Sequence, residues 1–195
     1  MRIPGLQVLS FVEFRVDVAT VRTICDEHRG APALCGEVSS LVRFAPPLVP
    51  AVVTAQSPRR GKQFLLFDAE GESGWLATDG SGKVIGYCWR LDNRGQSVIR
   101  REVNIPCGWS WFHHEWTVPA WRGHGVLPAL LLRSMMDALA QPTWSVQGFV
   151  TDIVPENHAS QRSSAKVGFR PVRRVTSLRV GSQWFLLHSE VTTES

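Results

Sequence analysis

Residues 114–133 read His-Glu-Trp-Thr-Val-Pro-Ala-Trp-Arg-Gly-His-Gly-Val-Leu-Pro-Ala-Leu-Leu-Leu-Arg, and this stretch decides the fold of the chain. The apolar, aromatic run 109–118 predicts a buried strand. The strand ends at Pro119, because proline fixes its own φ and keeps the preceding residue extended. Residues 126–139 carry apolar side chains at helical spacing. The loop between them, Arg-Gly-His-Gly at 122–125, directs backbone N–H groups and a helix N-terminus at one spot, which suits a phosphate.

A second segment downstream has the same order of strand, loop and helix. Residues 149–154, Phe-Val-Thr-Asp-Ile-Val, predict a strand. Residues 157–169 follow as Asn-His-Ala-Ser-Gln-Arg-Ser-Ser-Ala-Lys-Val-Gly-Phe. Two such segments in order along one chain are much more specific than either alone.

Together the two segments resemble the acyl-CoA-binding motifs of the Gcn5-related N-acetyltransferase (GNAT) superfamily. The match to the first motif runs in order through Val118, Pro119, Arg122, Gly123, His124, Gly125 and Val126. Leu127 and Pro128 stand where the family has a final small residue. The second segment resembles the family's Asn-X-X-Ser/Ala…Lys-X-Gly-Phe pattern. The resemblance covers residues 63–191 best, and residues 1–62 are divergent.

The resemblance implies one GNAT-like acyltransferase domain over residues 1–195. Its fold would be α/β, with a mixed, splayed central sheet flanked by helices. The implied activity is N-acyl transfer, most simply of acetyl from acetyl-CoA to an amine, by direct attack in a ternary complex. The implied donor-site residues are Trp116, Thr117 and Val118 for the pantetheine arm, Arg122, Gly123, His124, Gly125, Val126 and Leu127 for the pyrophosphate, and Asn157 and Ser160 on the second helix.

Acylation of an amine needs a proton acceptor for the amine and a proton donor for the departing thiolate. His113, His114 and Glu115 have suitable side chains. Strand alternation predicts His114 on one face, with His113 and Glu115 on the other. Glu115 is the preferred base, because carboxylates on this strand often act so in the family, and His114 is the other candidate. Ser164 stands where the family often has a tyrosine as the acid; water, Ser160 or no dedicated acid are the alternatives.

Two other functions stay open. The tryptophan-rich segment and the bulky Leu127 are compatible with a longer acyl donor. The serine in place of tyrosine, with the altered end of the glycine loop, is compatible with a non-catalytic module that binds coenzyme A or a partner. Residues 113–115 lack the helical histidine spacing of a zinc site, so no metal is expected. The acceptor amine is open, and so is a homodimer.

The composition bounds the class of protein. The chain has 195 residues, 44% hydrophobic and 19% charged, with a formal net charge of +4. These values are typical of a globular domain. The basic residues are dispersed, so no nucleic-acid partner is expected. No apolar run approaches the roughly 20 residues that cross a bilayer, and the N-terminus lacks a signal-peptide core, so we expect a cytoplasmic protein without a membrane partner.

The rest of the chain is assigned from periodicity and turn signals. Predicted strands are 7–18, 63–68, 74–78, 83–90, 171–180 and 183–191, with turns at 79–82 and 181–182. Predicted helices are 18–28, capped by Asp17, and 33–44. Residues 45–62 are predicted to be a loop, residues 92–105 a polar excursion, and residues 192–195 a frayed tail.

Overall fold

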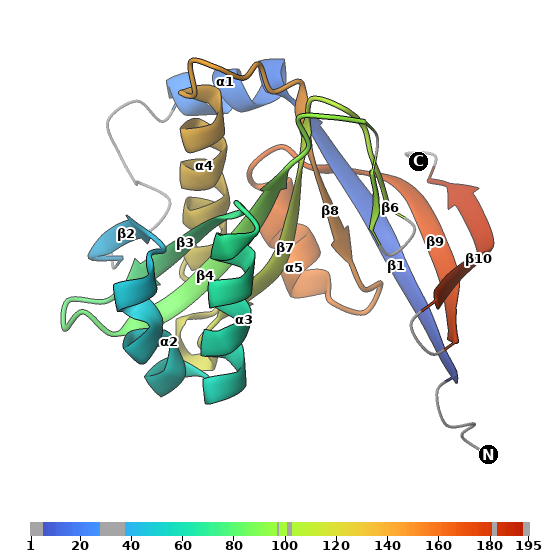
Figure 1. The fold of residues 1–195 in the computed structure, drawn as a ribbon. Coiled ribbons are helices and arrows are strands. Elements are labelled where there is room, and N and C mark those ends of the chain that lie inside the picture. The colour runs from blue at the N-terminus through green and yellow to red at the C-terminus, as the bar shows by residue number, and fades with distance from the viewer. Residues whose placement is uncertain (1–5, 28–37, 97, 101–102, 181–182, 193–195) are drawn as a thin grey trace.

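The computed structural model describes residues 6–27, 38–96, 98–100, 103–180 and 183–192. Its centre is an eight-stranded sheet in the order β10-β9-β1-β8-β7-β4-β3-β2 (Figure 1). A separate hairpin, β5–β6, lies beside it. The strands are β1 (Leu6–Asp17), β2 (Ser40–Arg43), β3 (Ser73–Thr78), β4 (Val84–Asp92), β5 (Val98–Arg100), β6 (Val103–Ile105), β7 (Trp109–Thr117), β8 (Gly148–Ile153), β9 (Arg170–Val180) and β10 (Gln183–Val191).

The sheet is mixed and splayed, as predicted. Neighbouring strands are antiparallel except β7 and β8, which run parallel. The β7–β8 pairing covers Trp109 to Phe112 against Gly148 to Thr151 and ends there over the described residues. β7 continues to Thr117, and the two strands diverge (Figure 1). The divergence leaves main-chain groups in the second half of β7 without a partner in β8.

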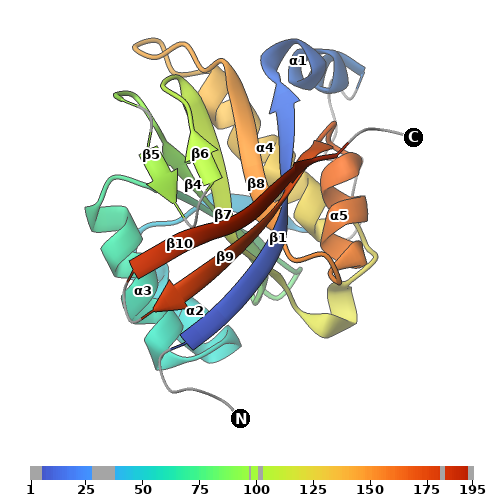
Figure 2. The same cartoon turned by 90° about the vertical axis from the view of Figure 1, so that its right-hand side faces the viewer.

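Helices cover both faces of the sheet (Figures 1 and 2). α1 (Val18–Glu27), α4 (Val126–Leu139) and α5 (His158–Ala165) lie on one face. α2 (Val49–Ala55) and α3 (Pro58–Ala69) lie on the other, preceded by the short 3-10 turn Pro46–Leu48. The first face buries the apolar stripe of α4, including Leu130, Leu131 and Met135. The second buries an aromatic cluster around Phe64, Tyr87 and Trp89.

Several predicted elements are confirmed. The strand and helix at the start are β1 and α1, and the Asp17 carboxylate accepts a 2.8 Å hydrogen bond from the Thr20 amide, as an N-cap does. That hydrogen bond lowers the pKa of Asp17. The 74–90 hairpin is β3–β4, and the two motif strands and helices are β7, α4, β8 and α5. The predicted turn at 181–182 and the tail residues 193–195 lie outside the described residues.

The predicted loop at 45–62 and strand at 63–68 are wrong, because α2 and α3 occupy this segment. Ser57 caps α3 by accepting from the Arg60 amide, and Pro58 fits its first turn. Phe64 and Phe67 are three residues apart and both contact the Trp89 ring, at 5.0 and 5.2 Å between centroids. A helix presents such a pair to one partner, whereas a strand would send the two rings to opposite faces.

The predicted helix at 33–44 is wrong where it can be compared. Residues 33–37 lie outside the described residues, and Ser40–Arg43 forms β2, which pairs with β3 from Thr78 to Trp75. The pairing satisfies the backbone of an otherwise weak segment, which outweighs its helical propensity. The polar excursion at 92–105 carries the β5–β6 hairpin, whose Val103 and Ile105 are fully buried.

Arg90 of β4 connects the sheet to α4, and this contact generates a stability prediction. Its fully buried guanidinium donates to Asp92 at 2.7 Å, to Asp137 at 3.2 Å and to the Ser134 carbonyl. Arg90→Met leaves the nearly buried Asp92 carboxylate without this partner. We expect a loss of about 3 kcal/mol in the free energy of unfolding, measured by urea denaturation.

The control is Arg133→Met. Arg133 is an exposed α4 residue whose guanidinium lies 4.9 Å from the Trp75 ring centroid. We expect this variant to lose less than about 1 kcal/mol. Equal losses in the two variants would contradict a structural role for the buried arginine.

Candidate functional site

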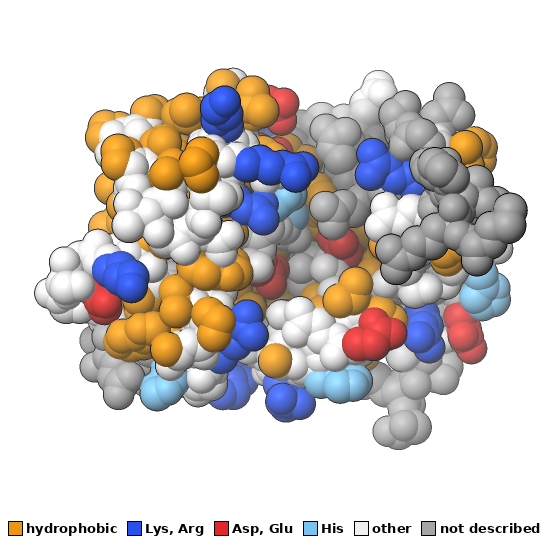
Figure 3. All heavy atoms as spheres, turned by 90° about the horizontal axis from the view of Figure 1, so that it is seen from below, with side chains coloured by type: hydrophobic (Ala, Val, Ile, Leu, Met, Phe, Trp, Pro, Cys, Tyr) orange, Lys and Arg blue, Asp and Glu red, His pale blue; other side chains and the backbone are white. Residues whose placement is uncertain are grey.

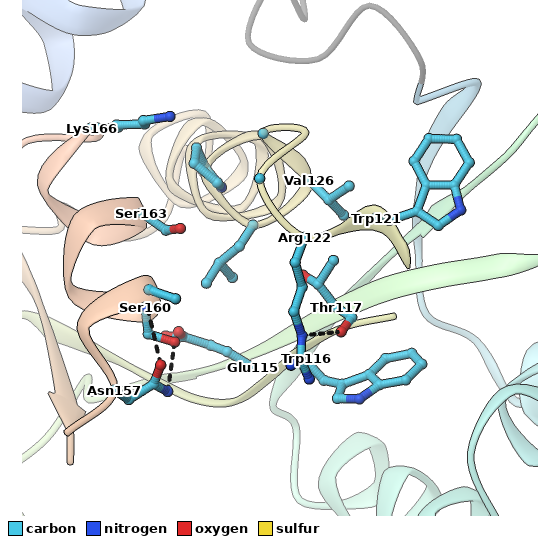
Figure 4. A pocket seen from close by; sticks show the side chains of 15 residues that line it. Glu115, Trp116, Thr117, Trp121, Arg122, Val126, Asn157, Ser160, Ser163 and Lys166 are labelled. Atoms are coloured by element: carbon cyan, nitrogen blue, oxygen red, sulfur yellow. Dashed lines mark hydrogen bonds between the residues drawn. The ribbon is translucent and has the colours of Figure 1, made fainter. Parts of the chain in front are cut away.

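A cavity of about 280 Å³ is formed by the second half of β7, the glycine loop, the start of α4 and one side of α5 (Figure 4). It lies where β7 and β8 diverge. Seen from below, a hollow near the centre of this face holds acidic side chains, with Lys or Arg and His side chains near its edge (Figure 3). The cavity is lined by Glu115, Trp116, Thr117, Trp121, Arg122, Gly123, Gly125, Val126, Leu127, Pro128, Asn157, Ala159, Ser160, Ser163 and Lys166.

The glycine loop has a conformation that needs its glycines. Gly123 and Gly125 have φ of 86° and 79°, in the left-handed region that L side chains rarely adopt. A Cβ built on Gly123 would meet nothing within 4 Å, so the space beside this backbone is open. Gly125 is also the N-cap of α4. The first N–H groups of α4 have no partner within the helix and lie at the cavity, where the positive end of the helix dipole favours an anion.

Close packing holds this loop against the sheet. A Cβ on Gly86 of β4 would lie 2.8 Å from Val126 Cγ1 and 3.0 Å from the Trp116 carbonyl oxygen. Only glycine therefore allows β4 to touch both the first turn of α4 and β7. The Arg122 Nε donates a long, 3.4 Å hydrogen bond to the Thr117 carbonyl, which ties the loop back to the end of β7 (Figure 4).

α5 presents polar side chains to the cavity at helical spacing. The Asn157 side chain caps α5: it accepts from the Ser160 amide at 3.2 Å and donates to Ser160 Oγ at 2.9 Å (Figure 4). Ser163 and Lys166 continue the same side of the helix. Ser164 is fully buried, and its hydroxyl has no hydrogen-bond partner among the described residues. The second serine hydroxyl in the cavity is therefore that of Ser163, not that of Ser164.

Glu115 is the carboxyl group of the cavity and points toward Ser160 and Asn157 (Figure 4). Burial raises its pKa from 4.5 to about 7. The hydrogen bond that Thr151 Oγ1 donates to it, at 3.1 Å, opposes this rise, and the charge of Asp152 adds to it. Such a carboxyl exists in both protonation states near neutral pH.

A β-bulge separates Glu115 from the two histidines before it. Tyr87 and Trp89 pair with Trp116 and His113, so Cys88 alone stands opposite His114 and Glu115. His114 has φ of 50°, the one positive value among the described non-glycine residues. The imidazoles of His113 and His114 both contact Phe67 of α3, at 5.0 and 4.8 Å between ring centroids. The predicted alternation, with His113 and Glu115 on one face, is wrong because the bulge interrupts it.

Sequence reasoning did not assign Trp121, Ser163 or Lys166 to the cavity. The three-residue steps between Asn157, Ser160, Ser163 and Lys166 were a usable signal, since residues three apart lie on the same side of a helix. Val118 and His124 belong to the predicted donor site but do not line the cavity. Within the part of the chain that the structure describes, no group of three His, Cys, Asp or Glu side chains could hold a metal ion. No helix in that part combines the length and hydropathy needed to cross a membrane.

The fold matches solved structures of GNAT proteins. A tandem GNAT protein of the clavulanic acid biosynthesis pathway matches with a TM-score of 0.61 and 16% identity, over 97% of this chain and 55% of its own. A putative GNAT acetyltransferase from Novosphingobium aromaticivorans matches with a TM-score of 0.52 and 12% identity. The match covers 99% of this chain and 70% of that protein. Aminoglycoside 6'-N-acetyltransferase from Acinetobacter baumannii matches with a TM-score of 0.51 and 9% identity. The match covers 67% of this chain and 90% of that protein.

No protein-family model and no curated protein sequence matches the chain. The chain spans little more than half of the tandem protein, 55% of its length. The structural matches and the splayed, mixed sheet together show that the chain has the GNAT fold.

The raised pKa of Glu115 generates a prediction about stability and pH. The folded chain keeps the Glu115 proton up to about pH 7, whereas an unperturbed carboxyl loses it near pH 4.5. The protonated carboxyl therefore contributes its full stabilisation below pH 4.5, and this contribution is lost as the pH rises through 7. Glu115→Gln keeps the acceptor for Thr151 and removes the charge. We expect it to be more stable than the wild type at about pH 8, by on the order of 3 kcal/mol, because the pKa of Glu115 rises from 4.5 to about 7 and each unit corresponds to about 1.4 kcal/mol.

Urea unfolding at about pH 5 and pH 8 measures the effect, and the advantage should shrink at the lower pH. Glu156→Gln, at an exposed position before α5, is the matched control and should leave the stability unchanged at both. An advantage of the same size at both pH values would show that Glu115 is not desolvated in this way.

Proposed function

We propose that the chain is an acyl-CoA-dependent N-acyltransferase that moves an acetyl group from acetyl-CoA to an amine. The observation that carries the proposal is the cavity between the diverging strands. The N-terminus of α4 lines this cavity, and the left-handed glycine loop leads into that helix. The GNAT fold supports it. One matched protein is by name an aminoglycoside N-acetyltransferase, which supports an amine as the acceptor class.

The residues of the cavity fit coenzyme A as the donor. The amides between Arg122 and Leu127, with the open space beside Gly123, suit a pyrophosphate. Arg122 and Lys166 supply positive charge on two sides of the same cavity. The main chain of β7 at Trp116 and Thr117, past the end of its pairing with β8, can hydrogen-bond the amides of the pantetheine arm.

Transfer requires an uncharged amine and a proton for the departing thiolate. Glu115 is the titratable group of the cavity that can hold or give that proton, because its pKa is near 7. Ser160 and Ser163 are the hydroxyls that share the cavity with it. Ser164 is not assigned a role, because its hydroxyl is buried away from the cavity.

Two alternatives each have an observation in their favour. Trp116 and Trp121 line the cavity and favour a longer acyl donor. The burial of Ser164, at the position where GNAT enzymes often have a tyrosine, favours a module that binds coenzyme A without efficient transfer. A comparison of acyl-CoA donors of different chain length tests the first alternative. A measurement of free thiol released from the donor tests the second.

Donor binding is tested by the shift in melting temperature with coenzyme A, acetyl-CoA and longer acyl-CoAs. A ligand that binds only the folded chain stabilises it by about 2.7 kcal/mol at a hundredfold excess over its Kd. We expect Arg122→Glu and Lys166→Glu each to weaken donor binding about 10- to 100-fold, because each loses a charged contact to phosphate.

Arg162→Glu is the matched control: Arg162 is exposed on α5 and does not line the cavity. It should keep the wild-type shift. A shift that persists in Arg122→Glu and Lys166→Glu would exclude the cavity as the donor site. Release of free thiol only when an amine is added would support transfer, and tight donor binding without release for any amine tested would favour the non-catalytic alternative.

A further inference from the structure

A chain of five polar side chains lies on the α3 face of β7, on the opposite side of the strand from Glu115. Neighbouring members are joined by contacts of 2.6 to 2.9 Å. In order they are Arg60 and Gln63 of α3, His114 and His113 of β7, and Glu72, which follows α3. None of these residues lines the donor cavity. We call this set the histidine relay.

The Arg60 end of the histidine relay determines where its protons are. Arg60 Nη1 donates to Gln63 Oε1 at 2.6 Å, so the Gln63 amide nitrogen faces His114 Nε2, at 2.9 Å. An amide nitrogen only donates, so His114 Nε2 must be the acceptor and carry a lone pair. The His114 proton is then on Nδ1, which lies 2.7 Å from His113 Nδ1.

The same argument continues to the carboxylate. His113 Nδ1 accepts from His114, so the His113 proton is on Nε2, which lies 2.8 Å from Glu72 Oε2 in a close contact that lacks the geometry of a hydrogen bond. Glu72 and His113 are nearly buried, with 8% and 3% of their side chains exposed. One pattern of protons, with two neutral imidazoles, therefore fits the three hydrogen bonds that run from Arg60 to His113.

Packing holds both rings in this arrangement. The Trp111 ring stacks on His113 at 4.6 Å, and Phe67 contacts both imidazoles from α3. The bulge at His114 turns its side chain to the same face as His113, at a backbone φ of 50° that a non-glycine residue rarely adopts. Such backbone strain is more common at functional sites than elsewhere. Here the strained backbone at His114 accompanies a direct contact between the side chains of two adjacent histidines.

We propose that the histidine relay is the proton acceptor for the amine, with His114 as the catalytic residue and His113, Glu72 and Gln63 as positioning residues. The proposal rests on the proposed N-acyltransferase function and deepens it. It also assigns the acceptor amine to the α3 face of β7. His114 is partly exposed, and its Nε2 lone pair accepts a hydrogen bond from the neutral Gln63 amide, which an amine or a water bound to it can displace.

The proton transfer balances without any further reactant. As the amine nitrogen forms its bond to the acyl carbon and the carbon–sulfur bond breaks, an amine proton passes to His114 Nε2. The His114 Nδ1 proton passes to His113 Nδ1, so the positive charge ends on His113, beside the Glu72 carboxylate. Glu115, on the cavity side, gives its proton to the departing thiolate. Exchange with solvent then restores both sites.

The charged groups around the histidine relay favour this direction of transfer. Glu72 faces the His113 end, where the positive charge would finish. Arg60 faces the Gln63 end and disfavours positive charge on that side. Asp152 of β8 is held by Trp111 Nε1 at 2.8 Å. A proton entering at His114 therefore moves away from a cation and toward an anion.

The first test reads the resting protons directly and needs no donor. Long-range ¹H–¹⁵N NMR spectra report which nitrogen of each imidazole carries the proton, with signals assigned from His113→Gln and His114→Gln. We expect the Nδ1–H form for His114 and the Nε2–H form for His113. In Gln63→Leu, which removes the donor to His114 Nε2, the preference of His114 should be lost. An Nε2–H form of His114 in the wild type would overturn the relay.

The second test separates a catalytic role from a structural one. Glu72→Gln keeps a polar side chain of the same size beside His113 and removes only the charge. We expect its kcat to fall about tenfold, within the range of general-base contributions, while the KM for the donor and the acetyl-CoA melting shift stay unchanged. Its pH–rate profile should also differ from that of the wild type, because the carboxyl group beside His113 has been replaced by a neutral amide. Glu70→Gln, an exposed site two residues away, is the control and should behave as the wild type.

The outcomes distinguish the two proposals. If the wild type transfers acyl groups and Glu72→Gln matches Glu70→Gln in rate and pH profile, the relay is overturned and the proposed function stands. If the wild type releases no thiol with any amine, the proposed function is wrong. The role of His114 as the proton acceptor for the amine is then wrong as well. If Glu72→Gln does not fold, Gln63→Leu decides, because loss of the His114 preference with unchanged kcat also overturns the relay.

Discussion

The early end of the pairing between β7 and β8 is the constraint on which the site depends. Parallel strands normally continue their hydrogen bonds, and stopping them at Phe112 and Thr151 leaves main-chain groups to be satisfied by something else. In this chain the divergence leaves room for the cavity, and α4 and α5 supply its walls. The loop glycines and Gly86 allow the first turn of α4 to lie close to the exposed edge of β7.

The bulge in β7 adds a second consequence to the same strand. A regular strand would send alternate side chains to each face, so neighbouring histidines could not share a proton. With Cys88 alone opposite His114 and Glu115, the two imidazoles meet under α3 and Glu115 turns to the cavity beside α4 and α5. One backbone irregularity thus places a carboxyl group and two imidazoles on opposite sides of a single strand.

The parts of the fold that sequence reasoning predicted correctly are those with a strong local signal. The β3–β4 hairpin has turn residues between two apolar runs, α4 has a long apolar stripe, and Asp17 is a good N-cap. The parts that it predicted wrongly have short or ambiguous signals. Residues 64–67, Phe-Leu-Leu-Phe, suit a strand or a helix, and only the position of Trp89 favours the helix. Ser40–Arg43 became a strand because the edge of β3 was available to pair with it.

For the site, the sequence by itself determined the glycine loop, the helix that follows it and the polar residues at the start of α5, because these contacts are local and their spacing is visible. Only the tertiary structure decided which side chains share a space. It put Ser164 in the core and Ser163 in the cavity, and it brought Glu72 and Gln63 to the histidines from about forty to fifty positions away in the chain. The physical reason is that such contacts depend on how α3 packs on the sheet and on a bulge of one residue. Neither leaves a periodic pattern in the sequence.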